Sequence, residues 1–192
     1  MKVTRGEGIL EGFLARRRAA KANKLLKQVE KGIILDIGCG ALPYFLLNTS
    51  FSQKHGIDSS LTTTSIKDLK LDKRNVAGQR LPFKDNYFNA VTMLAVFEHI
   101  DHDKLKAVLT EIRRVLKKNG VFVITTPAPW SDKLLHQMAK VGLISKEEIH
   151  EHKHNLSHKK IKDYLVEVVF SKHKIKSGYF EAFMNMWFRA EK

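Results

Sequence analysis

The sequence predicts an α/β fold of the Rossmann-like, doubly wound type, in which helices cover both faces of a mostly parallel sheet. Three observations support this prediction. Residues 33–37 form a nearly unbroken apolar run that ends at a Gly-x-Gly turn, which is typical of a parallel strand buried on both faces. A strand, a helix and another strand are predicted over residues 88–126. Residues 170–190 predict two consecutive strands, which gives a seven-stranded sheet whose last strand is antiparallel.

The composition favours a single domain in a reducing compartment. A chain of 192 residues with 43% hydrophobic residues can bury one core, but it is too short for two comfortable domains. No apolar run approaches the roughly 18 residues of a membrane span. The N-terminal region lacks the basic-then-apolar order of a secretion signal. A single cysteine excludes an internal disulfide and a multi-cysteine metal site. We therefore expect a cytoplasmic protein.

The net charge of +14 is large for this length. It favours an anionic partner, such as nucleic acid, an anionic lipid surface or a phosphorylated substrate. The alternative is an ordinary solvated surface, because the lysines are spread along the chain rather than gathered with aromatic residues. The sequence does not decide the oligomeric state.

Residues 8–30 predict a basic amphipathic helix that ends near Gly32. Its apolar positions are Ile9, Leu10, Phe13, Leu14, Leu25, Leu26 and Val29, and its other face carries Arg16, Arg17, Arg18, Lys21, Lys24 and Lys27. We divide the chain into this N-terminal cap, residues 1–31, and a main domain, residues 32–192. The basic face is either a clamp on an anionic substrate or a solvated surface.

The first predicted strand carries Asp36 just before Gly38 and Gly40. Glycines at this point allow a sharp turn and leave room for a ligand at the carboxyl end of the strand. A carboxylate buried there needs partners, so we expect Asp36 to order the glycine loop and to face a polar ligand. Pro43 then favours the start of a short helix that extends through Leu47.

A second strand is predicted over residues 51–57, and Asp58 follows it. Asp58 stands 22 positions after Asp36, and the two oxygens of a carboxylate at this place can accept both hydroxyls of a ribose. The alternative is that Asp58 caps a helix that begins at Ser59 or Ser60. Residues 61–80 have little pattern, although Ile66, Leu69 and Leu71 indicate a short third strand.

Further motifs follow along the chain. Leu81, Pro82 and Phe83 precede the fourth strand, residues 88–94, after which Glu98 and His99 stand side by side. A helix over residues 103–118 and a strand over residues 121–126 complete the pattern. With the glycine loop, these motifs resemble the class I S-adenosylmethionine (SAM)-dependent methyltransferases, and in particular their small-molecule, type 11-like branch. The resemblance covers residues 32–127.

The resemblance implies an enzyme that binds SAM and transfers its methyl group to an O, N or C nucleophile, leaving S-adenosylhomocysteine (SAH). The cofactor-binding residues that it implies are Asp36, Gly38, Cys39, Gly40, Asp58, Ser59, Gln79, Arg80, Leu81, Ala95 and His99. His99 is also a candidate general base, because the unperturbed pKa of histidine lies near neutrality. Methyl transfer needs alignment more than a strong base, so a base is not obligatory.

Three positions depart from the family pattern. Leu42 stands where the family commonly has glycine, and Ala77 and Asn89 stand where it commonly has aspartate. These departures favour, as one alternative, a SAM-binding protein without catalysis. The positive charge favours, as another, a nucleic-acid or protein methyltransferase.

Residues 128–157 are expected to shape the substrate site, with Trp130 and His154 as candidate substrate contacts. His150, His152, His154 and His158 could in principle hold a metal, but the resembling family needs none and we predict no metal. Ser157 is expected to cap a helix from residue 158 to 169. The last strands are expected at 170–176 and 181–190, with the turn at Ser177 and Gly178.

Overall fold

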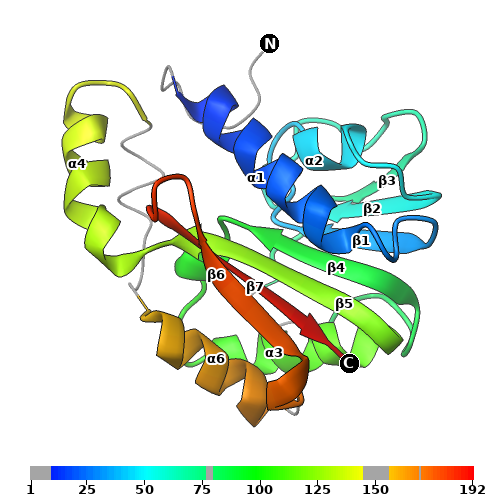
Figure 1. Ribbon diagram of the computed structural model, residues 1–192. Helices are drawn as coiled ribbons and strands as arrows, with labels where there is room; N and C mark the ends of the chain where they lie inside the picture. Colours follow the sequence, from blue (N-terminus) through cyan, green and yellow to red (C-terminus); the bar gives the residue numbers. More distant parts are fainter. Residues whose placement is uncertain (1–9, 77–79, 145–155, 169) are drawn as a thin grey trace.

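A computed structural model describes residues 10–76, 80–144, 156–168 and 170–192. It contains one seven-stranded sheet with the strand order β3-β2-β1-β4-β5-β7-β6 (Figure 1). The strands are β1 (Ile33–Ile37), β2 (Gln53–Ile57), β3 (Leu69–Asp72), β4 (Phe88–Leu94), β5 (Leu116–Pro127), β6 (Ile175–Phe180) and β7 (Asn185–Glu191). The α-helices are α1 (Glu11–Leu26), α2 (Tyr44–Leu47), α3 (Leu105–Val115), α4 (Asp132–Lys140) and α6 (His158–Glu167).

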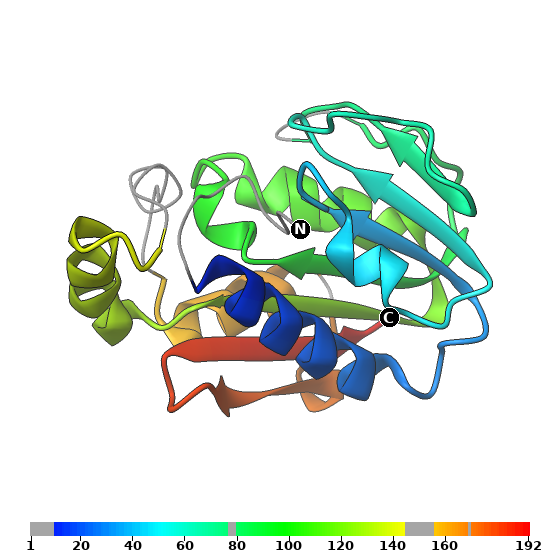
Figure 2. The same ribbon diagram turned by 90° about the horizontal axis from the view of Figure 1, so that it is seen from above.

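Helices cover both faces of the sheet, which confirms the doubly wound prediction. Figure 1 shows α1 and α2 on one face and α3 and α6 on the other. Each face has its own buried apolar cluster, the larger one beneath α3 and α6 and the other beneath α1 and α2. In the view from above, α1 crosses the sheet diagonally and α4 lies beyond its end (Figure 2).

The centre of the sheet is parallel, and its register places the carboxyl ends of β1, β2 and β4 next to one another. β1 pairs in parallel with β2 on one side and with β4 on the other. Asp36 is thereby paired in register with Gly56 of β2 and Thr92 of β4. The carboxyl ends of these three strands lie at one edge of the sheet, which is where ligands bind in open α/β folds.

The C-terminal strands confirm the antiparallel ending, but they lie elsewhere than predicted. β7 runs antiparallel to both β5 and β6. The predicted strand at 170–176 is wrong for most of its length, because Lys172–Lys174 form a 3-10 turn and β6 begins only at Ile175. Phe170 is buried in the core, where its ring stacks 6.3 Å from that of Phe122. The predicted turn at Ser177 and Gly178 is also wrong, since both residues belong to β6. Gly178 serves a close approach instead, because a Cβ there would lie 3.0 Å from Trp187 Nε1.

The turn between β6 and β7 consists of residues 181–184, so the last strand begins at Asn185 rather than at residue 181; Glu181, Ala182 and Phe183 all have positive φ. None of them is glycine, so their composition does not signal a turn of this kind. This explains why the sequence pattern placed the turn too early.

Other boundaries also differ from the predictions. α3 ends at Val115 rather than at residue 118, and β5 begins at once, with an irregular register opposite Phe88 and Ala90. α1 ends at Leu26, and the face that it buries is formed by Ala19, Ala22 and Leu26. Phe13, assigned to its apolar stripe, is half exposed. The short side chains of Ala19 and Ala22 allow α1 to lie close to the sheet, and Leu26 adds a large apolar contact at its end.

The segment after β5 contains a short 3-10 turn, Pro129–Ser131, and α4. The predicted cap of α6 is confirmed, since the Ser157 hydroxyl accepts a hydrogen bond from the Lys160 N–H. His150, His152 and His154 lie outside the described residues. Over the described parts of the chain, no group of three or more metal-ligating side chains comes together, and no helix is long and apolar enough to cross a membrane.

His55 of β2 is buried in an aromatic cluster on the face opposite to α1. Its ring lies 5.5 Å from that of Phe83, 5.8 Å from that of Tyr87 and 5.3 Å from that of Phe88, each in an edge-on arrangement. Burial lowers the pKa of His55 to about 4, so the imidazole is neutral in the folded protein at neutral pH.

We predict that His55 makes the protein sensitive to mild acid. Below the ordinary histidine pKa, the unfolded chain binds a proton that the folded chain excludes until about pH 4, so stability falls as the pH is lowered through this window. Between pH 7.5 and pH 5, the wild type should lose about 2 kcal/mol more unfolding free energy than His55→Leu. Urea unfolding at both pH values measures this, and parallel losses in the two proteins would contradict it.

Candidate functional site

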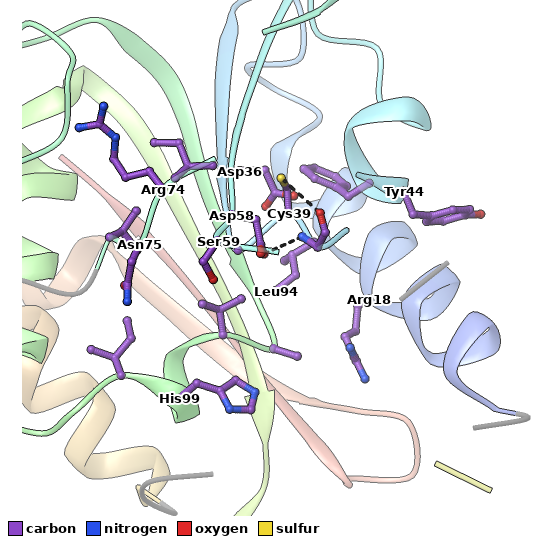
Figure 3. A pocket seen from close by; sticks show the side chains of 18 of the residues that line it. Arg18, Asp36, Cys39, Tyr44, Asp58, Ser59, Arg74, Asn75, Leu94 and His99 are labelled. Carbon is purple, nitrogen blue, oxygen red and sulfur yellow. Dashed lines mark hydrogen bonds between the residues drawn. The ribbon is translucent and has the colours of Figure 1, made fainter. Parts of the chain in front are cut away.

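A cavity of about 640 Å³ opens at the carboxyl ends of β1, β2 and β4 and is bordered by α1 (Figure 3). The residues that line this cavity extend along the sequence from Ala15 in α1 to Lys104, directly before α3. The lining comprises Ala15, Arg18, Asp36, Gly38, Cys39, Gly40, Leu42, Tyr44, Phe45, Ile57, Asp58, Ser59, Arg74, Asn75, Val76, Leu94, Ala95, Val96, His99, Ile100, Asp101 and Lys104. Its size is typical of a pocket for a ligand of nucleoside dimensions.

The glycine loop after β1 forms the floor of this cavity, and its two glycines serve different purposes. Both have left-handed backbones, with φ of 74° at Gly38 and 79° at Gly40. A Cβ on Gly38 would lie only 2.2 Å from Val96 Cγ2, so the absence of a side chain permits close packing there. A Cβ on Gly40 would meet nothing closer than the Leu42 carbonyl at 3.7 Å. Gly40 therefore leaves space on the cavity side.

Asp58 ties this loop to the end of β2. Its Oδ2 accepts a hydrogen bond of 2.8 Å from the Gly40 N–H, and its Oδ1 accepts one of 2.7 Å from the Ser60 N–H and another from the Ser60 hydroxyl. Residues 59 and 60 form a turn, so the alternative in which Asp58 caps a helix is wrong. The carboxylate instead organises the loop and borders the cavity.

Asp36 is buried and holds one strong hydrogen bond to its neighbouring strand. The Thr92 hydroxyl donates to Asp36 Oδ1 at 2.6 Å. Burial is the main reason that the pKa of Asp36 is raised to about 7. The hydrogen bond from Thr92 lowers this pKa, and the nearby charge of Asp58 raises it. Asp36 is thus poised to gain or lose a proton near neutral pH.

Cys39, between the two glycines, is the only cysteine in the chain. Its thiol is buried, and both this burial and the carboxylates of Asp36 and Asp58 raise its pKa well above the usual range. A thiol that stays protonated is a poor nucleophile. Cys39 therefore contributes to the lining rather than to covalent chemistry.

The segment after β4 closes the other side of the cavity. Ala95 has a positive φ of 56°, and its N–H donates to the Thr125 carbonyl. The short 3-10 turn Phe97–His99 follows, and from it His99 borders the cavity (Figure 3). Glu98 points elsewhere: it is buried, does not line the cavity, and its Oε2 has no hydrogen-bond partner within the described structure.

The structure therefore collects most of the predicted cofactor residues around one space. Those that line it are Asp36, Gly38, Cys39, Gly40, Asp58, Ser59, Ala95 and His99. Gln79 and His154 lie outside the described residues.

Arg80 and Leu81, in contrast, do not line the cavity. Arg80 is exposed, and Leu81 is buried in the core. The Leu81 N–H donates to Glu111 Oε2 at 2.9 Å, and its carbonyl accepts from Arg114 Nη2 at 3.1 Å. These contacts join the segment to α3. Trp130 is 56% exposed and also stands outside the lining.

Two of the departures from the family pattern can be located. Asn89 Oδ1 accepts hydrogen bonds from the Ile33 N–H and from Lys117 Nζ, both at 3.0 Å. These contacts are at the start of β1, the end away from the cavity, so Asn89 does not alter the site. Leu42 does line the cavity. Ala77 lies outside the described residues.

Several lining residues were not identified from the sequence. Arg74, Asn75 and Val76 follow β3. Ligands meet the carboxyl ends of parallel strands, but the sequence pattern indicated this strand without fixing the residue at which it ends. Arg18 projects from α1, and periodicity alone did not distinguish it from the other basic residues of that helix.

Comparison with known proteins agrees with this geometry. Residues 35–124 match a family model described as a methyltransferase domain. An uncharacterized protein of Methanocaldococcus jannaschii is 38% identical over 105 residues, which is 52% of this chain and 44% of that protein. The match thus spans less than half the length of that relative.

Solved structures share the fold at low sequence identity. A SAM-dependent methyltransferase of Thermotoga maritima, described as a possible histamine N-methyltransferase, has a TM-score of 0.69 at 18% identity over 94% of this chain and 92% of its own. The plantazolicin methyltransferase, solved with a substrate analogue and SAH, has a TM-score of 0.68 at 12% identity over 94% and 83% of the two chains. At these identities the likeness shows a shared fold.

We predict that alanine is tolerated less well at position 38 than at position 40. A left-handed alanine costs about 1 kcal/mol at either site, but at position 38 the overlap with Val96 adds about 1–3 kcal/mol. Urea unfolding of Gly38→Ala, Gly40→Ala and Gly38→Ala/Val96→Ala should show the largest loss in the first variant. Because Val96→Ala removes the overlapping methyl groups, Gly38→Ala should cost less unfolding free energy in the Val96→Ala background than in the wild type. Equal losses at positions 38 and 40 would refute the close-packing role of Gly38.

Proposed function

We propose that this chain is an enzyme of the class I SAM-dependent methyltransferase superfamily, which transfers the methyl group of SAM to an O, N or C nucleophile of a small molecule. The observation that supports this most directly is the arrangement of Asp58 and Gly40. A carboxylate at the end of β2 and an open glycine at the end of β1 border the same cavity.

The residues around the cavity fit such a cofactor. In the proposed arrangement, Asp36, Gly38, Cys39 and Gly40 surround its amino-acid end. Asp58 and Ser59 hold the ribose, because a carboxylate can accept two hydroxyl hydrogen bonds. Ala95 and His99 border the end that carries the methyl group. All of these residues line the cavity, whose volume of about 640 Å³ suits a ligand of this size.

Bound SAM supplies an electrophilic methyl group on a sulfonium. The chain's contribution is to align the acceptor and to exclude water, which together supply most of what a methyl transfer requires. His99 can accept the proton that the acceptor loses, since its side chain borders the cavity. This role of His99 is part of the proposal.

The acceptor site is proposed to lie between the N-terminal cap, residues 1–31, and the segment 128–157. Two residues of α1, Ala15 and Arg18, line the cavity, which supports a covering role for this helix. Trp130, exposed at the start of this segment, stays a candidate contact for the acceptor. The single cysteine supports a cytoplasmic location.

We predict that Asp58→Asn weakens SAH binding by about ten- to a hundred-fold, which corresponds to losing about 1.5–3 kcal/mol from hydrogen bonds to a charged group. Titration calorimetry measures this, with NAD as the control ligand. Asp163→Asn, an exposed site on α6, makes the same chemical change away from the cavity and should leave binding unchanged.

A 2′-deoxy analogue of SAH separates the ribose role from a loop effect. It should bind the wild type more weakly than SAH does, yet bind Asp58→Asn about as well as SAH, because the two changes remove the same interaction. Independent, additive losses would refute the ribose assignment. SAH binding without turnover of any small molecule, but with salt-sensitive nucleic-acid binding, would favour the nucleic-acid alternative. Absence of any transfer would favour a non-catalytic binding protein.

We predict that SAH binding is linked to proton release by Asp36. The folded protein holds a proton on Asp36 below about pH 7, whereas a bound ligand ammonium favours the ionised carboxylate, so binding must expel that proton. The affinity should fall by up to about tenfold for each pH unit below 7. Titrations between pH 5.5 and 7.5 measure the slope. Asp36→Asn should bind more weakly but with no such slope, and a slope that persists in this variant would assign the proton to another group.

A further inference from the structure

The cavity contains three cationic side chains, and two of them already have carboxylate partners. Lys104 Nζ lies 2.7 Å from Asp101 Oδ2. Arg74 Nε lies 3.1 Å from Asp72 Oδ2. The third cation is Arg18, and the described structure shows no hydrogen bond from its buried Nε.

Arg18 interacts electrostatically with Glu181, in the turn between β6 and β7. The positive charge of Arg18 opposes the burial that raises the pKa of Glu181. Glu181 has other contacts, however. Its Oε2 accepts a hydrogen bond of 2.6 Å from Asn185 Nδ2, and its Oε1 lies 3.9 Å from Arg17 Nε. Glu181 therefore offsets part of the positive charge of Arg18, but it does not accept a hydrogen bond from the Arg18 Nε–H.

Arg18 is held by a rigid support. Ala19 and Ala22, the first of which is its neighbour, are buried where α1 packs over the sheet, so the fold sets the place on α1 from which the Arg18 side chain extends. Figure 3 shows Arg18 extending from α1 toward the part of the cavity that His99 lines, away from Arg74 and Asn75. A guanidinium presented in this way suits planar oxyanions, because its N–H groups form a fork that matches a carboxylate or a phosphate.

We propose that the methyl acceptor is an anion and that Arg18 binds its carboxylate or phosphate group beside His99. The inference rests on the proposed function and narrows it to one class of substrate. Binding would give the buried Nε–H an acceptor and would pair the one lining cation that, in the described structure, lacks a carboxylate contact of this kind. The strongly positive chain, with a net charge of +14, would also favour the approach of such a substrate.

The experiment uses anionic probes on the full chain saturated with SAH. Phenyl phosphate and benzoate are the probes, and benzyl alcohol is the neutral counterpart. We expect both anions to bind the SAH complex in calorimetric or NMR titrations and the alcohol to bind without dependence on Arg18. Arg18→Gln should weaken anion binding at least tenfold, and Arg18→Lys less. Arg16→Gln removes the same charge from an exposed position of α1 and should leave anion binding unchanged.

A second arm distinguishes the acceptor from the cofactor, whose own carboxylate has the same chemistry. SAH and 5′-methylthioadenosine, which lacks the amino-acid end, are titrated into the wild type and Arg18→Gln. Unchanged affinity for both supports the proposal. A loss for SAH alone would show that Arg18 binds the cofactor carboxylate and would overturn it, as would anion binding that is equal in wild type and Arg18→Gln. If the wild type fails to bind SAH at all, the proposed function falls and this inference with it.

Discussion

The hydrogen bond from the Gly40 N–H to Asp58 Oδ2 is the contact on which the shape of the site depends. It links the glycine loop after β1 to the end of β2, where the Gly38 and Cys39 N–H groups also donate to the Ile57 carbonyl, and it holds the loop at a defined distance from β2. The same carboxylate also receives both donors of Ser60, so its position is determined from two sides. A side chain held in this way loses little freedom when a ligand arrives, which is the advantage of a preorganised site.

The charges in the site follow from the same geometry. Parallel pairing buries Asp36 between β2 and β4, and its proximity to Asp58 makes simultaneous ionisation costly. The structure therefore lets Asp36 carry a proton near neutral pH while Asp58 uses its charge in hydrogen bonds. In the proposed complex, a cationic group of the ligand would relieve the repulsion between the two. Arg18 adds a positive charge to the lining from α1.

The sequence predicted the parts of the fold that depend on short-range patterns. The apolar run of β1, the spacing of Asp36 and Asp58, and the Ser157 cap are local signals, and each appears where it was expected. Features that depend on distant contacts were not predictable in this way. Gly178 was assigned to a turn, but it is in a strand because Trp187 crosses it, and this contact joins residues of different strands.

The residues of the site also fall into those that local sequence patterns predict and those that depend on distant contacts. The predicted residues of the glycine loop, of the end of β2 and of the 95–99 segment line one cavity, because each directly follows a strand whose end is recognisable. Arg18 and Arg74 required knowledge of where α1 and β3 lie in space. Leu81 matched a family motif, yet its backbone is bound by Glu111 and Arg114, so the motif reflects the packing of α3 as much as any ligand.

The position of β7 between β5 and β6 has a consequence for folding kinetics. β5 is long and largely buried, and one of its edges is completed only by β7, whose residues 185–191 are synthesised last of all the strands. Until β7 inserts, the emerging chain presents an unpaired apolar strand edge of the kind that promotes intermolecular pairing. We therefore expect the parallel half of the sheet to assemble first and the pairing of β7 with β5 to be the late, aggregation-prone step.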